Sequence, residues 1–246
     1  MASPTFLGDQ QTALQALRRM NSDLLKYPIL KDIKLLERDE IVRRAAEFRR
    51  AGVLLDVGCG LGEDMYAIAD RINGRVVGID YNPLAIANCP PHPKLEFRVM
   101  DARKIEFPDA AFDLAYITVN TLGNFGLMER HAWLKEILRV SGMTLVSLYP
   151  NTGDQEAMGI PSRLQYYHDL VDSDVIFDGH TFSCRSRGWV GRLFALEEIA
   201  EMFRAYGIRD YELTRLSEIL LSVAIPAQRL PDRPDTSGIN LLSWDM

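Results

Sequence analysis

Residues 53–62 read VLLDVGCGLG, an apolar run that reaches Asp56 and continues into three glycines at every second position. Glycine lets a chain leave a buried strand and turn tightly into a helix, because it has no Cβ to clash. It also lets the backbone approach a ligand, toward which the following helix directs its free amides. The stretch therefore predicts a strand–turn–helix unit whose ligand is a phosphate, a dinucleotide or another molecule that contains adenosine.

The spacing of the glycines narrows these alternatives. Gly58, Gly60 and Gly62 form a GxGxG pattern, whereas a dinucleotide-binding turn has GxGxxG. A phosphate-binding Walker loop ends in GK[ST], and this turn does not. The glycines alone leave the ligand undecided, so the choice depends on the strands that follow.

Two later strands also end in acidic residues. The segment VVGIDYNP places Asp80 at the end of the second strand, where a carboxylate can accept hydrogen bonds from both hydroxyls of a ribose. The segment VMDA places Asp101 at the end of the third strand, where it can accept from an adenine amino group. Ligands of open α/β sheets bind at the carboxyl ends of the strands. The pattern therefore predicts an adenosine-type ligand with a free 2′-hydroxyl.

The rest of the chain predicts an α/β fold. Two helices are expected over residues 9–26 and 30–52, and from residue 53 to 149 apolar strands alternate with helices. Such alternation indicates a parallel sheet that is covered on both faces. After residue 193 a helix is followed by two adjacent strands, expected to pair in antiparallel fashion. We therefore expect five segments: 1–50, an N-terminal helical cap; 51–149, the cofactor-binding half; 150–193, an inserted substrate lid with some strand content over 174–187; 194–228, the completion of the domain; and 229–246, a C-terminal tail.

Composition bounds the class of protein. The chain has 246 residues, of which 47% are hydrophobic, and a net charge of −6. An acidic chain gains nothing from bulk electrostatics in binding nucleic acid, so a small-molecule partner is favoured. Cys59, Cys89 and Cys184 form no CxxC pair, which argues against a disulfide scaffold and a metal site. No apolar stretch approaches the ~20 residues of a membrane span. We therefore expect a cytoplasmic protein without a membrane partner. We expect it to be a monomer or a homodimer.

Taken together, four motifs resemble those of the class I S-adenosylmethionine-dependent methyltransferases. They are LLDVGCGLG (54–62), VVGIDYNP (76–83), VMDARKIEFPDAAFDLAYI (99–117) and GMTLVSLY (142–149), in the family order. The resemblance covers about residues 50–225, apart from the insertion. It implies a Rossmann-like, seven-stranded, mostly parallel sheet flanked by helices, with an antiparallel strand near the C-terminus and an inserted lid after strand 5. It also implies a transferase, with S-adenosylmethionine as cofactor and S-adenosylhomocysteine as product.

The resemblance implies roles for residues at the predicted sheet edge. Asp80 is expected to hold the ribose, Tyr81 to stack near adenine, and Asp56 to order the glycine turn. The full set of implied cofactor contacts is Asp56, Gly58, Gly60, Gly62, Asp80, Tyr81, Asp101, Ala102 and Thr118. Asp64 lies in the first turn of the following helix, where an acid also suits the helix dipole.

The methyl acceptor is less well defined by the sequence. The fourth strand runs into TVNTLGNF, which lacks the [ND]PP[YFW] motif of nucleic-acid amino methyltransferases. The catalytic candidates are Asn120, Asn124 and, as a base, His168. The substrate-binding candidates, chosen as aromatic and basic residues of the insertion and its entry, are Tyr149, Tyr166, Tyr167, Arg185, Arg187 and Trp189.

These features favour an enzyme (EC 2.1.1.-) that moves a methyl group by in-line displacement to a nitrogen or oxygen of a small metabolite. Two alternatives stay open. One is a non-catalytic module that binds S-adenosylmethionine or S-adenosylhomocysteine. The other is an aminopropyltransferase-like enzyme, although TVNTLGN offers no acidic pair to hold a polyamine.

Overall fold

The computed structural model describes residues 9–22, 26–48 and 52–237. Its centre is a seven-stranded sheet with the order β3-β2-β1-β4-β5-β10-β9. The strands are β1 (Val53–Val57), β2 (Arg75–Asp80), β3 (Leu95–Val99), β4 (Phe112–Ile117), β5 (Ser141–Leu148), β9 (Glu212–Ser217) and β10 (Leu220–Pro226). Strands β1 to β5 pair in parallel, whereas β10 is antiparallel to both β5 and β9. The predicted Rossmann-like sheet and its antiparallel strand are confirmed.

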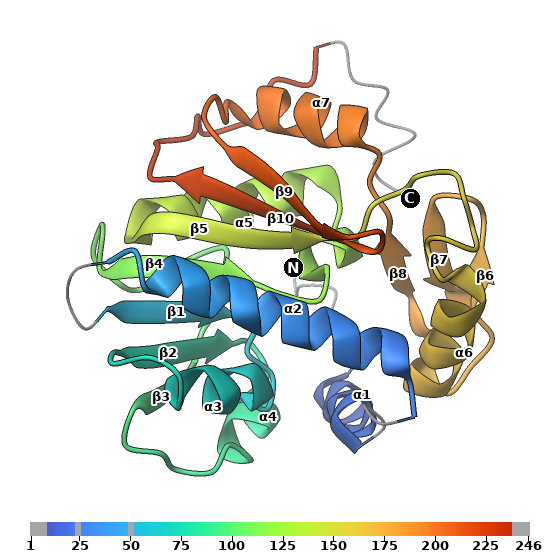
Figure 1. Ribbon diagram of the computed structural model, residues 1–246, viewed down its shortest axis with the longest axis horizontal. Coiled ribbons are helices and arrows are strands. Elements are labelled where there is room, and N and C mark those ends of the chain that lie inside the picture. Colours follow the sequence, from blue (N-terminus) through green and yellow to red (C-terminus); the bar gives the residue numbers. More distant parts are fainter. Residues whose placement is uncertain (1–8, 23–25, 49–51, 238–246) are drawn as a thin grey trace.

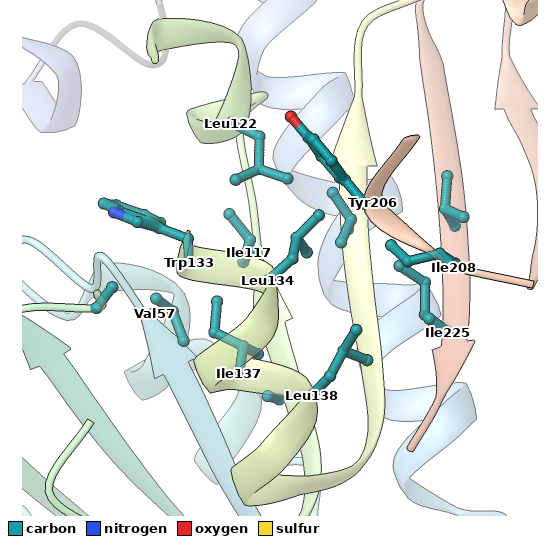
Figure 2. Packing of buried hydrophobic residues seen from close by; sticks show 14 of the residues in the cluster. Val57, Ile117, Leu122, Trp133, Leu134, Ile137, Leu138, Tyr206, Ile208 and Ile225 are labelled. Carbon is teal, nitrogen blue, oxygen red and sulfur yellow. The ribbon is translucent and has the colours of Figure 1, made fainter. Parts of the chain in front are cut away.

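Helices cover both faces of this sheet (Figure 1). One face packs against α2 (Pro28–Ala45) and α3 (Glu63–Ala69), through a core that includes Ile41, Met65 and Ile68. The other face packs against α5 (Leu127–Val140) and α7 (Leu196–Tyr206). Figure 2 shows α5 pointing Leu134, Ile137 and Leu138 at this second face. Burial of these apolar faces fixes the sheet and thereby the positions of the strand ends.

The segment after β5 forms a separate unit at the carboxyl ends of the strands (Figure 1). It contains α6 (Ile160–Val171) and a small antiparallel sheet of β6 (Ile176–Phe177), β7 (Thr181–Cys184) and β8 (Trp189–Arg192). The expected strand content near 174–187 is present, whereas α6 and β8 were not predicted. We keep the word lid for residues 150–193.

The first helix, α1 (Gln10–Ser22), lies beside α6 of the lid (Figure 1), and its Leu17 packs next to Gly60 of the glycine turn. Arg19 Nη1 donates to the carbonyl of Asp169 on α6 at 3.4 Å. On its other side Gln10 accepts a hydrogen bond from Asn82 Nδ2 at 3.0 Å, next to α4 (Pro83–Ala87). Parts of the predicted cap and tail, at 1–8, 23–25, 49–50 and 238–246, lie outside the described residues. Within the described ranges, no helix is both long and apolar enough to cross a membrane.

Candidate functional site

The glycine turn joins β1 to α3 and is tied to the end of β2. Gly58, Gly60 and Gly62 all have positive φ, at 80°, 54° and 75°. At Gly62 any side chain would also collide with Phe97, since a Cβ would lie 2.5 Å from its Cε1 atom. The Asp80 carboxylate accepts from Gly60 N at 2.9 Å and from Asn82 N at 2.8 Å. The turn and the strand-end acid are therefore one rigid unit.

Three adjoining cavities open around this unit, and Gly58 lines all of them. We name them the outer cavity, of about 90 Å³, the inner cavity, of about 40 Å³, and the aromatic cavity, of about 140 Å³. Asp80 and Tyr81 line both the outer and the aromatic cavity. The arrangement places a long cleft along the carboxyl edge of the sheet, with the glycine turn at its middle.

The outer cavity lies past the ends of β2 and β3. Asp101 and Ala102 line it, together with Phe125 and Trp133 from the segment after β4. Arg103 Nε donates to the Asp101 carboxylate at 3.0 Å, and this contact lowers the pKa of Asp101 despite its partial burial. Asp101 is therefore an ionised acceptor at neutral pH, beside two aromatic rings and one small side chain.

The inner cavity lies on the other side of the turn and contains a buried lysine. Lys34 of α2 places Nζ 3.0 Å from Asp64 Oδ2 and 3.3 Å from Glu63 Oε2. Burial would lower the pKa of Lys34, but the two carboxylates raise it above its usual value. Asp56, Thr118 and Asn21 also contribute polar groups to the lining. A cation held at this depth suits a ligand with a carboxylate.

Two buried acids beside this cavity, Glu37 and Asp56, have raised pKa values. Burial raises the pKa of Glu37 to about 7, and the negative charge of Asp64 adds to the shift. Burial likewise raises the pKa of Asp56 well above its ordinary value. Glu37 Oε1 accepts a hydrogen bond from the backbone amide of Val119 at 2.7 Å. Val119 has φ 49°, a left-handed conformation that is uncommon for a β-branched residue. Glu37 therefore holds a strained residue of the loop after β4.

The aromatic cavity is formed by segments far apart in the sequence. Tyr166 and Tyr167 come from α6 and Trp189 from β8, and the ring centroids of Tyr167 and Trp189 are 4.7 Å apart. Tyr149 follows the end of β5, and its ring centroid lies 4.0 Å from the guanidinium carbon of Arg163. The opposite side is covered by aliphatic residues of α1 and α2: Ala13, Leu17, Met20 and Leu30. Among the described lining residues, Asp80 is the only Asp, Glu, His, Lys or Arg.

The two asparagines after β4 have different surroundings, although both line the aromatic cavity. Asn120 is buried, donates from Nδ2 to the carbonyl of Arg192 at 2.8 Å and accepts the Tyr149 amide at 3.1 Å. It thereby joins β8 of the lid to the end of β5. Asn124 is half-buried, and its side-chain amide has no hydrogen-bond partner among the described residues.

The structure thus brings most of the predicted site residues to one cleft. Those that line a cavity are Asp56, Gly58, Gly60, Asp80, Tyr81, Asp101, Ala102, Thr118, Asn120, Asn124, Tyr149, Tyr166, Tyr167 and Trp189. Gly62 lies next to them as the N-cap residue that precedes α3. Their individual roles stay predictions.

Besides Gly62, three predicted residues are absent from the cleft lining. His168 is exposed on α6, with Nδ1 3.3 Å from Asp169. Arg185 is exposed, and Arg187 Nε donates to the carbonyl of Val171 at 3.1 Å. Conversely, Lys34 and the individual α1 residues were absent from the predicted set. For Lys34 the reason is that a lysine within a charged helix carries no local signal of burial.

The fold and cleft define a Rossmann-like domain with an apolar cavity beside the glycine turn. Residues 54–142 match the family described as a methyltransferase domain. The resemblance to class I methyltransferases seen in the motifs is confirmed over this segment of the chain.

Curated relatives match over limited lengths. The chain is 38% identical over 68 residues to phosphoethanolamine N-methyltransferase 3 of Arabidopsis thaliana, covering 26% of this chain and 14% of that protein. It is 28% identical over 110 residues to 2-methyl-6-phytyl-1,4-hydroquinone methyltransferase of Synechocystis, covering 42% and 34%. The chain therefore spans about a third or less of the length of these relatives.

A solved structure with the same fold matches over more of the chain. Human N-acetylserotonin methyltransferase in complex with SAM superposes with a TM-score of 0.57 at 14% identity. The match covers 86% of this chain and 55% of the human protein. The likeness extends the shared fold beyond the segment recognised by sequence.

Proposed function

We propose that the protein is an S-adenosylmethionine-dependent methyltransferase that moves a methyl group by in-line displacement to a nitrogen or oxygen of a small molecule. The observation that carries the proposal is the meeting of the outer, inner and aromatic cavities at Gly58. The two curated relatives are named for small acceptors, phosphoethanolamine and a hydroquinone, which supports the same substrate class.

The residues of the cleft fit the cofactor. Asp80 is fixed by two backbone amides and keeps lone pairs free for the ribose hydroxyls. Asp101, Ala102 and Tyr81 suit the adenine in the outer cavity. Lys34 and Thr118 suit the carboxylate and amino group of the methionine part in the inner cavity. When bound, the cofactor supplies a methyl group already activated by a positively charged sulfur.

Lys34 also bears on the aminopropyltransferase alternative. That reaction uses a decarboxylated cofactor, which has no carboxylate to pair with a buried ammonium. Lys34 is only 2% exposed and lines the inner cavity, and its ammonium has three donors of which Asp64 and Glu63 engage two. The third donor favours a cofactor that bears a carboxylate.

The chain's own contribution is approach and exclusion of water. A methyl donor that carries its own activation needs the acceptor held close and in line, which is worth several kcal/mol. We propose that the lid and α1 supply this cover, because Leu17, Tyr167 and Trp189 line the aromatic cavity from different segments. Closure around the cleft keeps water from the reacting groups.

An untargeted metabolite screen with isotope-labelled S-adenosylmethionine tests the proposal. We expect the labelled methyl group on one small metabolite, detected by mass spectrometry, and not on total RNA or DNA. Enzyme with Asp80→Ala serves as the negative control. Tight cofactor binding without any labelled product would instead support the non-catalytic module.

A further inference from the structure

We infer that the methyl acceptor is a compact, uncharged aromatic molecule whose nucleophile is a ring nitrogen or an aryl amine, oriented by Asn124 in the aromatic cavity. This inference rests on the proposed function and names the substrate class of the same site. Four observations carry it: the size of the cavity, a described lining in which Asp80 is the only Asp, Glu, His, Lys or Arg, the engagement of that one acid by the glycine turn, and one amide without a partner.

The size of the cavity limits the acceptor. Its volume is about 140 Å³, and Gly58 and Asp80 line one end, next to the cofactor cavities. An apolar cavity of about 150 Å³ in another protein holds a benzene-sized ring. Tyr167 and Trp189, with centroids 4.7 Å apart, offer aromatic surface for such a ring. A single ring with small substituents therefore fits this cavity.

The charge of the lining excludes ionised acceptors. No Lys, Arg or His lines this cavity among the described residues, so a carboxylate or phosphate has no cation to pair with. The single acid, Asp80, already accepts two backbone amides at the glycine turn and faces the ribose site. An alkyl ammonium would therefore lose its hydration without gaining a free carboxylate partner.

The lack of a base favours nitrogen over oxygen. A phenol or alcohol must lose its proton for efficient attack. Asp80 already accepts two backbone amides at the glycine turn, and no other Asp, Glu or His lines the cavity among the described residues. An aryl amine or ring nitrogen is neutral at pH 7 and presents its lone pair directly. In the transfer, that lone pair forms the N–C bond as the C–S bond breaks, and the electron pair of the broken bond stays on sulfur. The proton of an aryl amine then goes to water after release, whereas a ring nitrogen has none to lose.

Asn124 is the side chain that can orient such a nitrogen. Asn120 uses both ends of its amide on Arg192 and Tyr149, and Asn82 uses both ends on Gln10 and Leu84. The Thr121 hydroxyl donates to the Thr118 carbonyl at 2.8 Å. Asn124 lines the cavity with its donor and acceptor unused within the described part of the chain. Its carbonyl oxygen can accept an N–H, and its NH2 can donate to a ring substituent.

The test uses four probes of matched shape: 4-methylaniline, 4-methylphenol, 4-methylbenzoate and 4-methylbenzylamine. Calorimetry with the protein saturated in S-adenosylhomocysteine measures binding, and labelled S-adenosylmethionine measures transfer. We expect 4-methylaniline to bind at least tenfold more tightly than the benzoate and the benzylamine, and to accept methyl faster than 4-methylphenol. Tightest binding of a charged probe, faster transfer to the phenol, or no binding of any probe would overturn the inference.

Variants test the orienting residue and separate this inference from the proposed function. Asn124→Ala should weaken 4-methylaniline binding about tenfold, while S-adenosylhomocysteine affinity stays within threefold. Asn73→Ala, an exposed asparagine at the opposite edge of the sheet, is the matched control and should change neither. Unchanged binding in Asn124→Ala would overturn the role of Asn124. Failure of S-adenosylhomocysteine to bind the unmodified protein would instead contradict the proposed function itself.

Discussion

The inner and aromatic cavities meet at the same glycine turn, yet they are built by opposite means. The inner cavity is lined by charges, with Lys34 between Asp64 and Glu63. The aromatic cavity is lined by rings and aliphatic side chains, with Asp80 at its border. Under the proposed function, this difference lets one cleft hold the charged end of the cofactor by electrostatics and the acceptor by shape. If the inner and aromatic cavities act independently, a substitution in one should leave the other unchanged.

The largest effect is expected at Lys34, on the charged side. Removing one partner of a buried ion pair costs about 3–5 kcal/mol. Asp64 would keep Arg38, whose Nη2 lies 2.7 Å from Asp64 Oδ1. Lys34→Met should therefore lower the free energy of unfolding by about 3 kcal/mol, the lower end of this range, in urea denaturation at pH 7. Lys31→Met changes an exposed lysine of the same helix and should have little effect. A loss below about 1 kcal/mol in Lys34→Met would show that the buried charges are not coupled as the contacts indicate.

Glu37 predicts a pH dependence of stability. Its pKa is raised from 4.5 to about 7 in the folded protein, so between these values the folded state binds more protons than the unfolded state. The contribution of Glu37 is therefore fully present below pH 4.5 and is lost as the pH rises to about 7, amounting to ~3 kcal/mol.

Glu37→Gln keeps the acceptor for the Val119 amide and removes the titration. Relative to the unmodified protein, this variant should become more stable as the pH rises through that window, as measured by urea unfolding at several pH values. Asp39→Asn, at an exposed position of the same helix, is the control. A constant difference in stability between Glu37→Gln and the unmodified protein at all pH values would mean that Glu37 does not titrate there.

Asp80 lies at the glycine turn, where the cavities meet. Loss of hydrogen bonds to a charged group costs about 1.5–3 kcal/mol, so Asp80→Ala should weaken S-adenosylhomocysteine by roughly 10- to 150-fold. Asp70→Ala, at an exposed acid that follows α3, should leave the affinity unchanged. Circular dichroism must show that both variants fold. Equal affinities in the two variants would remove Asp80 from the cofactor site.

The smallest effect is expected at Arg185. Its side chain is exposed and lies outside the cavity lining, so Arg185→Ala should change the free energy of unfolding by less than about 0.5 kcal/mol. Methyl transfer to the true acceptor should stay within twofold in steady-state kinetics. A severe loss of transfer would mean that the lid moves Arg185 into the cleft when it binds the acceptor.

The two ends also differ in how well the sequence predicts them. Gly58 and Asp80 were found because a turn and a strand end are local patterns with a fixed spacing. Lys34 was not, since its burial depends on α3 packing across α2. In the lid, Trp189 and Arg185 were predicted as one group from their proximity in sequence. A turn between them sends Trp189 into the cleft and leaves Arg185 in solvent.

The central claim, that the glycine-turn edge binds S-adenosylmethionine and its product, is tested most directly by calorimetric titration with S-adenosylhomocysteine. A dissociation constant of about 1–10 μM, or roughly −7 to −8 kcal/mol, is the predicted result. NAD should give no heat of binding, because the turn has the GxGxG spacing. Binding of NAD with no binding of either S-adenosyl compound would contradict the account.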